Sequence, residues 1–267
     1  MDEIARYNRD RWDKLAGANA LFTRPALDLD ANSALSKVDA EGLFGEIAGQ
    51  RVLCLASGGG QQSAAFALLG ADVTVFDLSP AQLERDKQAA DSYGLKIRMI
   101  EGDMRDLSAL QPSSFDLVYQ PYSISFVPDA RAVFQEVSKV LRPGGIYFFA
   151  IGNPFFVGTT ERDWDPNSKG YLLKTPYLDG TKLDSHDPEW VYEKSESGAN
   201  PSIPEVREYR QTLSKLLNGL IELKFSLFHF SDSQHMHPDP TAEPGTWDHF
   251  VSFAPVFLSF WLRYVPV

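Results

Sequence analysis

Residues 51–77 (RVLCLASGGGQQSAAFALLGADVTVFD) place an apolar run, three consecutive glycines and a second apolar run within one short stretch of chain. The two apolar runs predict buried strands, because each is short, rich in Val, Leu or Phe, and close to a turn signal. The small residues of Gln61–Leu69 predict a helix, and Gly70 suits its C-terminal cap. Three glycines in one bend leave bare backbone against which a ligand can lie.

Asp77 stands at the carboxyl end of the second predicted strand. In an open parallel sheet, ligands bind in the crevice at the carboxyl ends of the strands. A carboxylate there can accept hydrogen bonds from both hydroxyls of a ribose, which predicts a cofactor that contains a nucleoside. The spacing Gly58-x-Gly60-x-x-Ser63 is also close to the dinucleotide fingerprint, so a nicotinamide cofactor is the first candidate.

Three more strands are predicted over Leu95–Ile100, Phe115–Tyr119 and Ile146–Ile151, the last preceded by a turn at Leu141–Gly145. With these motifs in this order, residues 50–152 resemble the class I S-adenosylmethionine (SAM)-dependent methyltransferases. The similarity is greatest to the small-molecule branch that includes the ubiquinone-biosynthesis enzymes. The resemblance implies an α/β fold with a Rossmann-like, doubly wound, seven-stranded sheet, mostly parallel with an antiparallel last strand.

The resemblance also implies SAM as the cofactor, with S-adenosylhomocysteine as its product. The cofactor-binding residues that it implies, position by position, are Ala56, Ser57, Gly58, Gly60, Asp77, Leu78, Asp103, Met104 and Gln120. The glycine loop would lie against the methionine part of SAM, and Asp77 would hold the ribose hydroxyls. Leu78 and Met104 would pack against the adenine, and Asp103 would accept a hydrogen bond from the adenine amino group. The backbone carbonyl of Gln120 would face the methionine amino group.

Two positions depart from the family pattern of acid-x-Gly-x-Gly-x-Gly: Cys54 replaces the acid and Ala56 replaces the first glycine. The first change removes a polar partner near the methionine end, and the second adds a methyl group to the turn. Gln61 and Gln62 can supply replacement hydrogen bonds, so Gln61 is also predicted to bind the cofactor. The departures leave open a non-catalytic SAM-binding protein, beside the alternative of a nicotinamide-dependent oxidoreductase.

The sequence suggests four regions. They are an N-terminal helical lid (1–49), a SAM-binding core (50–153), a substrate-covering insertion (154–204), and a C-terminal helix with edge strands of the same sheet (205–267). The insertion is rich in Gly, Pro and aromatic residues, which indicates a functional cover rather than a plain loop. In the last region we expect a helix over Glu205–Leu220 and strands over Ile221–Phe230 and Phe250–Val265.

The formal net charge of −11, with no dense run of Lys or Arg, argues against nucleic acid and against an anionic membrane surface as partners. The longest apolar run, near Phe250–Leu262, is broken by Pro255 and Ser259 and is too short to span a membrane. Cys54 is the sole cysteine, which excludes an internal disulfide. We expect a cytoplasmic monomer or homodimer that acts on a small molecule.

Methyl transfer from a sulfonium requires alignment of the acceptor, exclusion of water and, for an oxygen acceptor, removal of a proton. The candidate catalytic residues are His235, His237 and Tyr122. No metal site is predicted, because the two histidines lack a third ligand at zinc-like spacing. The expected acceptor is small and apolar or aromatic, with oxygen favoured over nitrogen or carbon.

Four further residues are candidates for contact with the substrate: Tyr7, Trp12, Ser123 and Arg207. Tyr7 and Trp12 could instead pack the first helix onto the domain, and Ser123 could be part of a structural loop. Arg207 could pair with a substrate carboxylate or be solvated.

Overall fold

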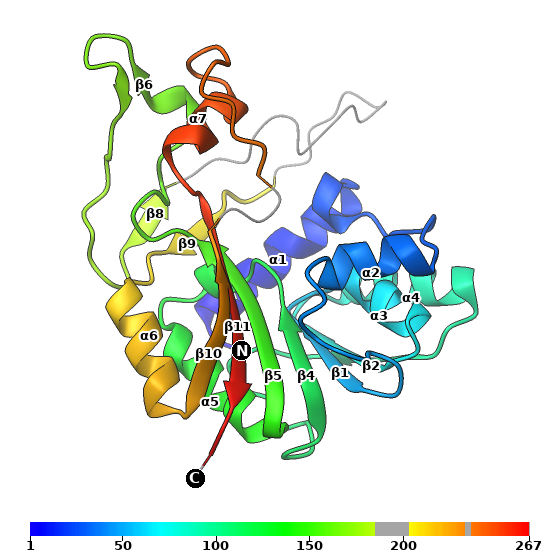
Figure 1. Cartoon of the computed structure of the whole chain (residues 1–267). Helices are drawn as coiled ribbons and strands as arrows, with labels where there is room; N and C mark the ends of the chain where they lie inside the picture. Colours follow the sequence, from blue (N-terminus) through cyan, green and yellow to red (C-terminus); the bar gives the residue numbers. More distant parts are fainter. Residues whose placement is uncertain (185–202, 233–235, 267) are drawn as a thin grey trace.

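A computed structural model describes residues 1–184, 203–232 and 236–266. Its centre is a seven-stranded sheet in the order β10-β11-β5-β4-β1-β2-β3 (Figure 1). In chain order these strands are β1 (Arg51–Leu55), β2 (Asp72–Asp77), β3 (Ile97–Glu101), β4 (Phe115–Gln120), β5 (Leu141–Gly152), β10 (Phe225–Ser231) and β11 (Phe257–Tyr264). β1 to β5 pair in parallel, whereas β11 pairs antiparallel with both β5 and β10. The predicted doubly wound sheet is confirmed.

Helices cover both faces of this sheet. The helices are α1 (Glu3–Gly17), α2 (Ala31–Asp39), α3 (Gln62–Leu68), α4 (Pro80–Tyr93), α5 (Ala130–Val140), α6 (Leu213–Glu222) and α7 (Trp247–Phe253), with short 3-10 turns η1 (Leu21–Thr23), η2 (Ile124–Phe126) and η3 (Glu161–Asp163). The apolar stripes of α5 and α6 form one core with the sheet, and α2 and α3 form the other. Within the described ranges, no helix combines the length and apolar character needed to cross a bilayer.

Local sequence explains where the central helices begin and end. Ser79 accepts a hydrogen bond from the backbone N–H of Gln82 and so caps α4, which has Pro80 in its first turn. Gly94, with φ of 65°, ends the same helix in the left-handed region that favours glycine. Gly70, with φ of 87°, follows α3 in the same way. These signals place α3 and α4 where the sequence predicts them.

The C-terminal region differs from its prediction in three places. Arg207 lies on a short strand, β9 (Arg207–Tyr209), rather than in a helix, because that segment pairs with β8 (Lys182–Asp184). Helix α6 then continues to Glu222, past the start expected for the next strand. The predicted strand over Phe250–Val265 begins as helix α7, and Pro255 separates this helix from β11.

The segment after β5 extends beyond the sheet and carries a small hairpin of β6 (Trp164–Asp165) and β7 (Gly170–Tyr171) (Figure 1). Tyr171 contacts the rings of Phe250 and Phe253, so the hairpin packs on α7. The Tyr171 hydroxyl also lies 2.8 Å from Nδ1 of the buried His249. The insertion and the C-terminal region are thus joined by an aromatic cluster.

Candidate active site

The bend between β1 and α3 is a tight glycine loop. Its φ angles are 45° at Ala56, 121° at Gly59 and 71° at Gly60, all in the left-handed half of backbone space. A Cβ on Gly58 would lie 2.6 Å from the Cβ of Gln82, and one on Gly60 would lie 2.5 Å from a backbone oxygen of α4. Helix α4 therefore packs directly on the loop, and this approach requires glycine.

Asp77 lies beside this loop at the end of β2, as predicted. Its Oδ2 accepts from the backbone N–H of Gly58 at 2.8 Å, and its Oδ1 accepts from that of Ser79 at 2.9 Å. Burial raises the pKa of Asp77 to about 6, and the nearby Asp13 adds to the rise. Each carboxylate oxygen keeps a second lone pair, so Asp77 can still accept from ligand hydroxyls. Leu78, next in the chain, is half-buried.

Asp86 on α4 also holds the loop, and the sequence analysis missed it. This fully buried carboxylate accepts from the backbone N–H groups of Gly59 and Gly60 at 3.0 and 3.1 Å, and from the hydroxyl of Ser63 at 2.5 Å. Burial raises the pKa of Asp86 to about 7. The spacing of residues along the helix could have indicated that Asp86 is buried, because it places Asp86 on the same side of α4 as Gln82 and Ala89.

A segment that follows α1 lies against the other side of the loop. The Gln61 amide donates to the backbone oxygens of Phe22 and Arg24 at 3.2 and 3.0 Å, and the backbone N–H of Ala26 donates to the oxygen of Gly60 at 3.1 Å. Gln61 therefore joins the glycine loop to the N-terminal region.

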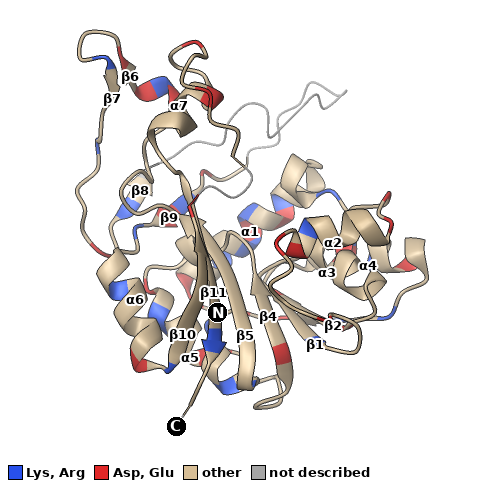
Figure 2. Cartoon of the chain, in the orientation of Figure 1, with Lys and Arg blue, Asp and Glu red and all other residues tan. Residues whose placement is uncertain are grey.

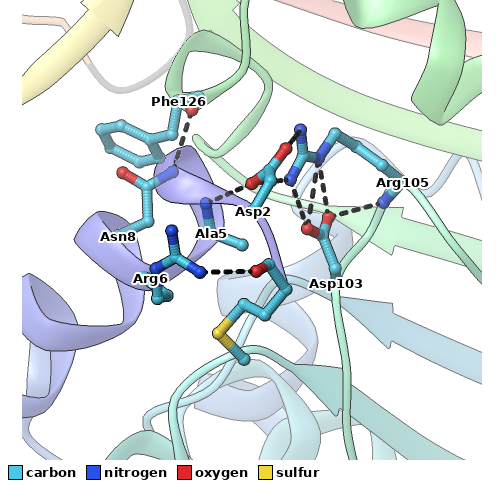
Figure 3. A network of polar contacts seen from close by, with 8 residues as sticks. Asp2, Ala5, Arg6, Asn8, Asp103, Arg105 and Phe126 are labelled. Atoms are coloured by element: carbon cyan, nitrogen blue, oxygen red, sulfur yellow. Dashed lines mark hydrogen bonds and ion pairs between the residues drawn. The ribbon is translucent and has the colours of Figure 1, made fainter.

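The loop after β3, where the adenine is expected, is joined to the start of α1 (Figure 3). Arg105 pairs with Asp103, with an Nη2–Oδ2 distance of 2.6 Å, and forms two 2.9 Å contacts with the carboxylate of Asp2. The same Asp2 caps α1 by accepting from Ala5 at 2.9 Å. Asp103 is thus held by a guanidinium that also fixes the first turn of the N-terminal helix.

Gln120 and Ser123 belong to a buried polar network at the end of β4. The Gln120 amide donates to Ser123 Oγ at 2.9 Å and contacts the sulfur of Met104 at 3.2 Å, while its oxygen accepts from Tyr147 at 2.6 Å. Gln120 is fully buried, and Ser123 and Met104 are nearly so. The three side chains are therefore fixed relative to one another at the carboxyl end of β4.

Tyr122 lies at the carboxyl ends of β4 and β5 and bonds to a residue of β9. Its hydroxyl donates to Oε1 of Glu208 at 2.5 Å, and its ring contacts Phe126 and Phe257 edge-on. A Cβ added to Gly152 would lie 2.9 Å from the Tyr122 hydroxyl. Burial raises the pKa of Tyr122 well above its usual value, and the adjacent Glu208 adds to the rise, so the phenol remains a hydrogen-bond donor.

The other three predicted substrate residues hold α1 in place. The guanidinium of Arg207 stacks 3.5 Å from the ring centroid of Tyr7, whose hydroxyl donates to the backbone oxygen of Glu205 at 2.7 Å. Trp12 contacts the ring of Phe126 edge-on. Of the predicted acceptor-site residues, Trp12 and Tyr122 thus meet at Phe126, whereas Tyr7 and Arg207 pair with each other.

Of the two predicted histidines, His237 has no described contact with Tyr122. His237 is exposed, and His235 lies outside the described residues. Among the residues that the structure describes, no three His, Cys, Asp or Glu side chains form a cluster that could hold a metal ion.

Comparison with known proteins identifies the family. Residues 53–149 match the model of a methyltransferase domain. The chain is 34% identical over 195 residues to an uncharacterized methyltransferase, YbaJ, of Bacillus subtilis, and the match covers 72% of this chain and 71% of YbaJ. The chain belongs to the methyltransferase family. The methyltransferase is an enzyme that uses SAM, which decides against the nicotinamide alternative.

Two further comparisons show a partial sequence similarity and a shared fold. It is 36% identical over 108 residues to a ubiquinone biosynthesis O-methyltransferase of Xanthomonas euvesicatoria, a match that covers 40% of this chain and 45% of that relative. A SAM-dependent methyltransferase structure from Mesorhizobium loti superposes with a TM-score of 0.62 and 24% identity, covering 89% of this chain and 100% of the other. The chain thus spans less than half of the ubiquinone relative but all of the structural neighbour's fold.

The residues of the methyltransferase fit its cofactor. Asp77 lies beside the glycine loop and offers carboxylate lone pairs at a strand end. Gln82, 2% exposed, has an Oε1 atom without a hydrogen-bond partner among the described residues, and this atom lies 3.2 Å from the Cβ position of Gly59. A buried acceptor beside the loop and Asp77 is matched by a ligand that donates O–H or N–H groups.

Proposed function

We propose that the enzyme transfers the methyl group of SAM to an oxygen atom of a small, apolar or aromatic acceptor. The acceptor would bind at the carboxyl ends of β4 and β5. The observation that carries this proposal is the Tyr122–Glu208 hydrogen bond of 2.5 Å, set among the rings of Phe126 and Phe257. A pocket with apolar walls and a few placed polar groups is typical of small-molecule sites.

The order of the sheet supports this place for the acceptor. The strand order reverses between β1 and β4, and ligands of such sheets bind at that point. The glycine loop follows β1 and Asp77 ends β2, so the cofactor would extend along that side. The acceptor would then lie on the other side, where Tyr122 follows β4.

The cofactor residues are proposed as the sequence analysis has them. Asp77 would hold the ribose, Leu78, Asp103 and Met104 would surround the adenine, and the loop would face the methionine part. The methionine part would be held by Ala56, Ser57, Gly58, Gly60 and Gln61, with the carbonyl of Gln120. When bound, SAM supplies a methyl group already activated on a sulfonium.

The chain's own residues would orient the acceptor and remove its proton. Tyr122 would position the acceptor hydroxyl, and the Glu208 carboxylate would take its proton as the oxygen–methyl bond forms and the sulfur–methyl bond breaks. The phenol of Tyr122 is suited to orientation, because its raised pKa keeps the proton on the oxygen. His235 and His237 remain alternative bases. The name of the Xanthomonas relative, an O-methyltransferase, supports an oxygen acceptor.

The four-region division also remains a proposal. β8 pairs with β9, and β9 carries Glu208, so the insertion 154–204 would contribute to a cover over the acceptor. α1 would act as the N-terminal part of that cover through Tyr7, Trp12 and Arg207.

Lys and Arg are scattered over the described elements rather than gathered on one (Figure 2). With the net charge of −11, this supports a small-molecule substrate, no nucleic acid or membrane partner, and a cytoplasmic monomer or homodimer.

The test is an acceptor screen read by mass spectrometry. The panel contains phenols, catechols, aliphatic alcohols, amines and activated carbon acids, each supplied with SAM. O-methylated aromatic products support the proposal; products methylated only on nitrogen or carbon, or none from a protein that binds SAM, overturn it.

Two variants then test the site. Glu208→Gln should lower kcat by about 100-fold and Tyr122→Phe by about tenfold, as expected for loss of a base and of an orienting group. Glu243→Gln and Tyr264→Phe are matched controls, since Glu243 is exposed and Tyr264 packs on Phe225 at the opposite end of the sheet. A Glu208→Gln enzyme with unchanged kcat and pH profile would rule out the proton-acceptor role.

A further inference from the structure

We propose that Asp86 is the positioning residue of the SAM loop and replaces, from helix α4, the acid that the family carries at the position of Cys54. This inference rests on the assigned cofactor and not on the identity of the acceptor. Asp86 does not touch the ligand in this scheme; it sets the conformation of the loop that does.

The hydrogen bonds of the Asp86 side chain join it to the loop and the first turn of α3. Its two oxygens accept from the successive backbone N–H groups of Gly59 and Gly60, and one of them also accepts from Ser63 Oγ. Two successive N–H groups in such a turn form an anion-binding concavity. Here the carboxyl group of Asp86 occupies that concavity. The N–H groups of Gly59 and Gly60 are therefore occupied, and the methionine carboxylate of SAM must be recognised by other groups.

Cys54 stands at the position where the family pattern has an acid. It is fully buried in β1, two residues before the loop begins, and close enough to Asp86 for the carboxylate charge to act on it. Burial raises the pKa of the Cys54 thiol, and Asp86 raises it further, so this thiol stays neutral. A neutral side chain at position 54 suits a neighbouring carboxylate, because two buried acids side by side would repel each other. In this chain the acid that supports the loop stands on the helix rather than on the strand.

The glycine loop has an uncommon backbone conformation, and Asp86 helps to fix it. Three of its residues, Ala56, Gly59 and Gly60, have positive φ. Such a conformation persists where surrounding contacts determine it. Asp77 fixes the N–H of Gly58, and Asp86 fixes the next two. Without Asp86, the part of the loop nearest α3 loses both of its hydrogen-bond acceptors.

The experiment measures the Kd for S-adenosylhomocysteine by calorimetry, together with the Tm of the ligand-free protein. The variants are Asp86→Asn, Asp86→Ala, and the relocated pair Cys54→Asp with Asp86→Ala. Asp91→Asn, on an exposed position of the same helix, is the matched control. We expect Asp86→Asn and Asp86→Ala to weaken binding at least about tenfold, because hydrogen bonds that fix the loop are lost. The relocated pair should recover to within about threefold of wild type.

The outcomes separate positioning from general stability. Wild-type affinity in a folded Asp86→Asn protein overturns the proposal, as does a relocated pair that binds no better than Asp86→Ala alone. If Asp86→Asn does not fold, Ser63→Ala removes one hydroxyl contact only. About threefold weaker binding is then expected, and unchanged affinity overturns the proposal. Failure of the acceptor screen leaves these results unaffected, since they depend on ligand binding alone.

Discussion

Arg105 and Asp2 form a two-point ion pair, with both nitrogen–oxygen distances at 2.9 Å, that joins the loop after β3 to the first turn of α1. The pair matters because Arg105 also contacts Asp103, the residue proposed to bind the adenine (Figure 3). The N-terminal helix and the cofactor site therefore share one guanidinium. Closure of α1 and order in the adenine loop are expected to change together.

Replacing Asp2 with Ala should destabilise the protein by about 1 kcal/mol, mostly through loss of the helix cap. The ion pair itself should add little, because Asp2 is about half exposed and such pairs contribute at most about 1 kcal/mol. A double-mutant cycle with Arg105→Ala, measured by urea denaturation, gives the coupling directly. Asp10→Ala, on the same helix, is the control. A coupling energy between Asp2 and Arg105 well above about 1 kcal/mol would show that the ion pair, rather than the helix cap, dominates the loss of stability.

Ala56 has φ of 45°, where glycine is preferred and where the family usually has glycine. Ala56→Gly should therefore raise the free energy of unfolding by about 0.5 kcal/mol, because relief of strain exceeds the added entropy of the unfolded chain. Ala132→Gly, inside helix α5, should instead lower it by about 1 kcal/mol. Thermal melts of both variants check the sign, and a loss of stability in Ala56→Gly would show that the loop conformation costs alanine nothing.

Asp77 and Asp86 make stability fall as the pH rises. Their folded pKa values, about 6 and about 7, lie above the usual 3.8, so the folded protein retains protons that the unfolded chain has released. The free energy of unfolding should therefore decrease from about pH 4 to about pH 7 and then level off. Denaturation at pH 5, 6, 7 and 8 should show a shallower decrease for Asp86→Asn than for wild type. Equal slopes would mean that Asp86 titrates normally.

Gln61→Ala should weaken SAM binding by about threefold to tenfold, since the side chain donates two bonds that join the glycine loop to residues 22 and 24. Calorimetry with SAM measures the change. Gln135→Ala, on an exposed position of α5, is the comparison. Wild-type affinity in Gln61→Ala would mean that the N-terminal segment does not support the loop.

Several local features were predictable because the chemistry that decides them lies within a few residues. The strand–glycine–helix–strand unit, the cap of α4 by Ser79 and the strand-end position of Asp77 all follow from short-range pattern. The alternation of strands and helices then leaves few topologies, and the parallel order is among them.

Other features depended on neighbours that are remote in the sequence. Arg207 was expected on a helix and lies on β9, because residues about 25 positions earlier in the chain, at β8, supply the pairing partner. Glu208 and Asp86 were missed for the same reason. Nothing near Glu208 in the sequence indicates that Tyr122, 86 positions away, will donate to it.

The sequence by itself determined the α/β fold and the place of the glycine loop, because periodicity and turn chemistry act over one or two turns of chain. The cofactor class followed from the resemblance of residues 50–152 to a known family. The tertiary structure alone decided which carboxylate holds that loop and which one faces Tyr122. Asp86 and Glu208 acquire their roles only when α4 packs on the loop after β1 and β9 lies beside η2, and burial then makes their hydrogen bonds specific.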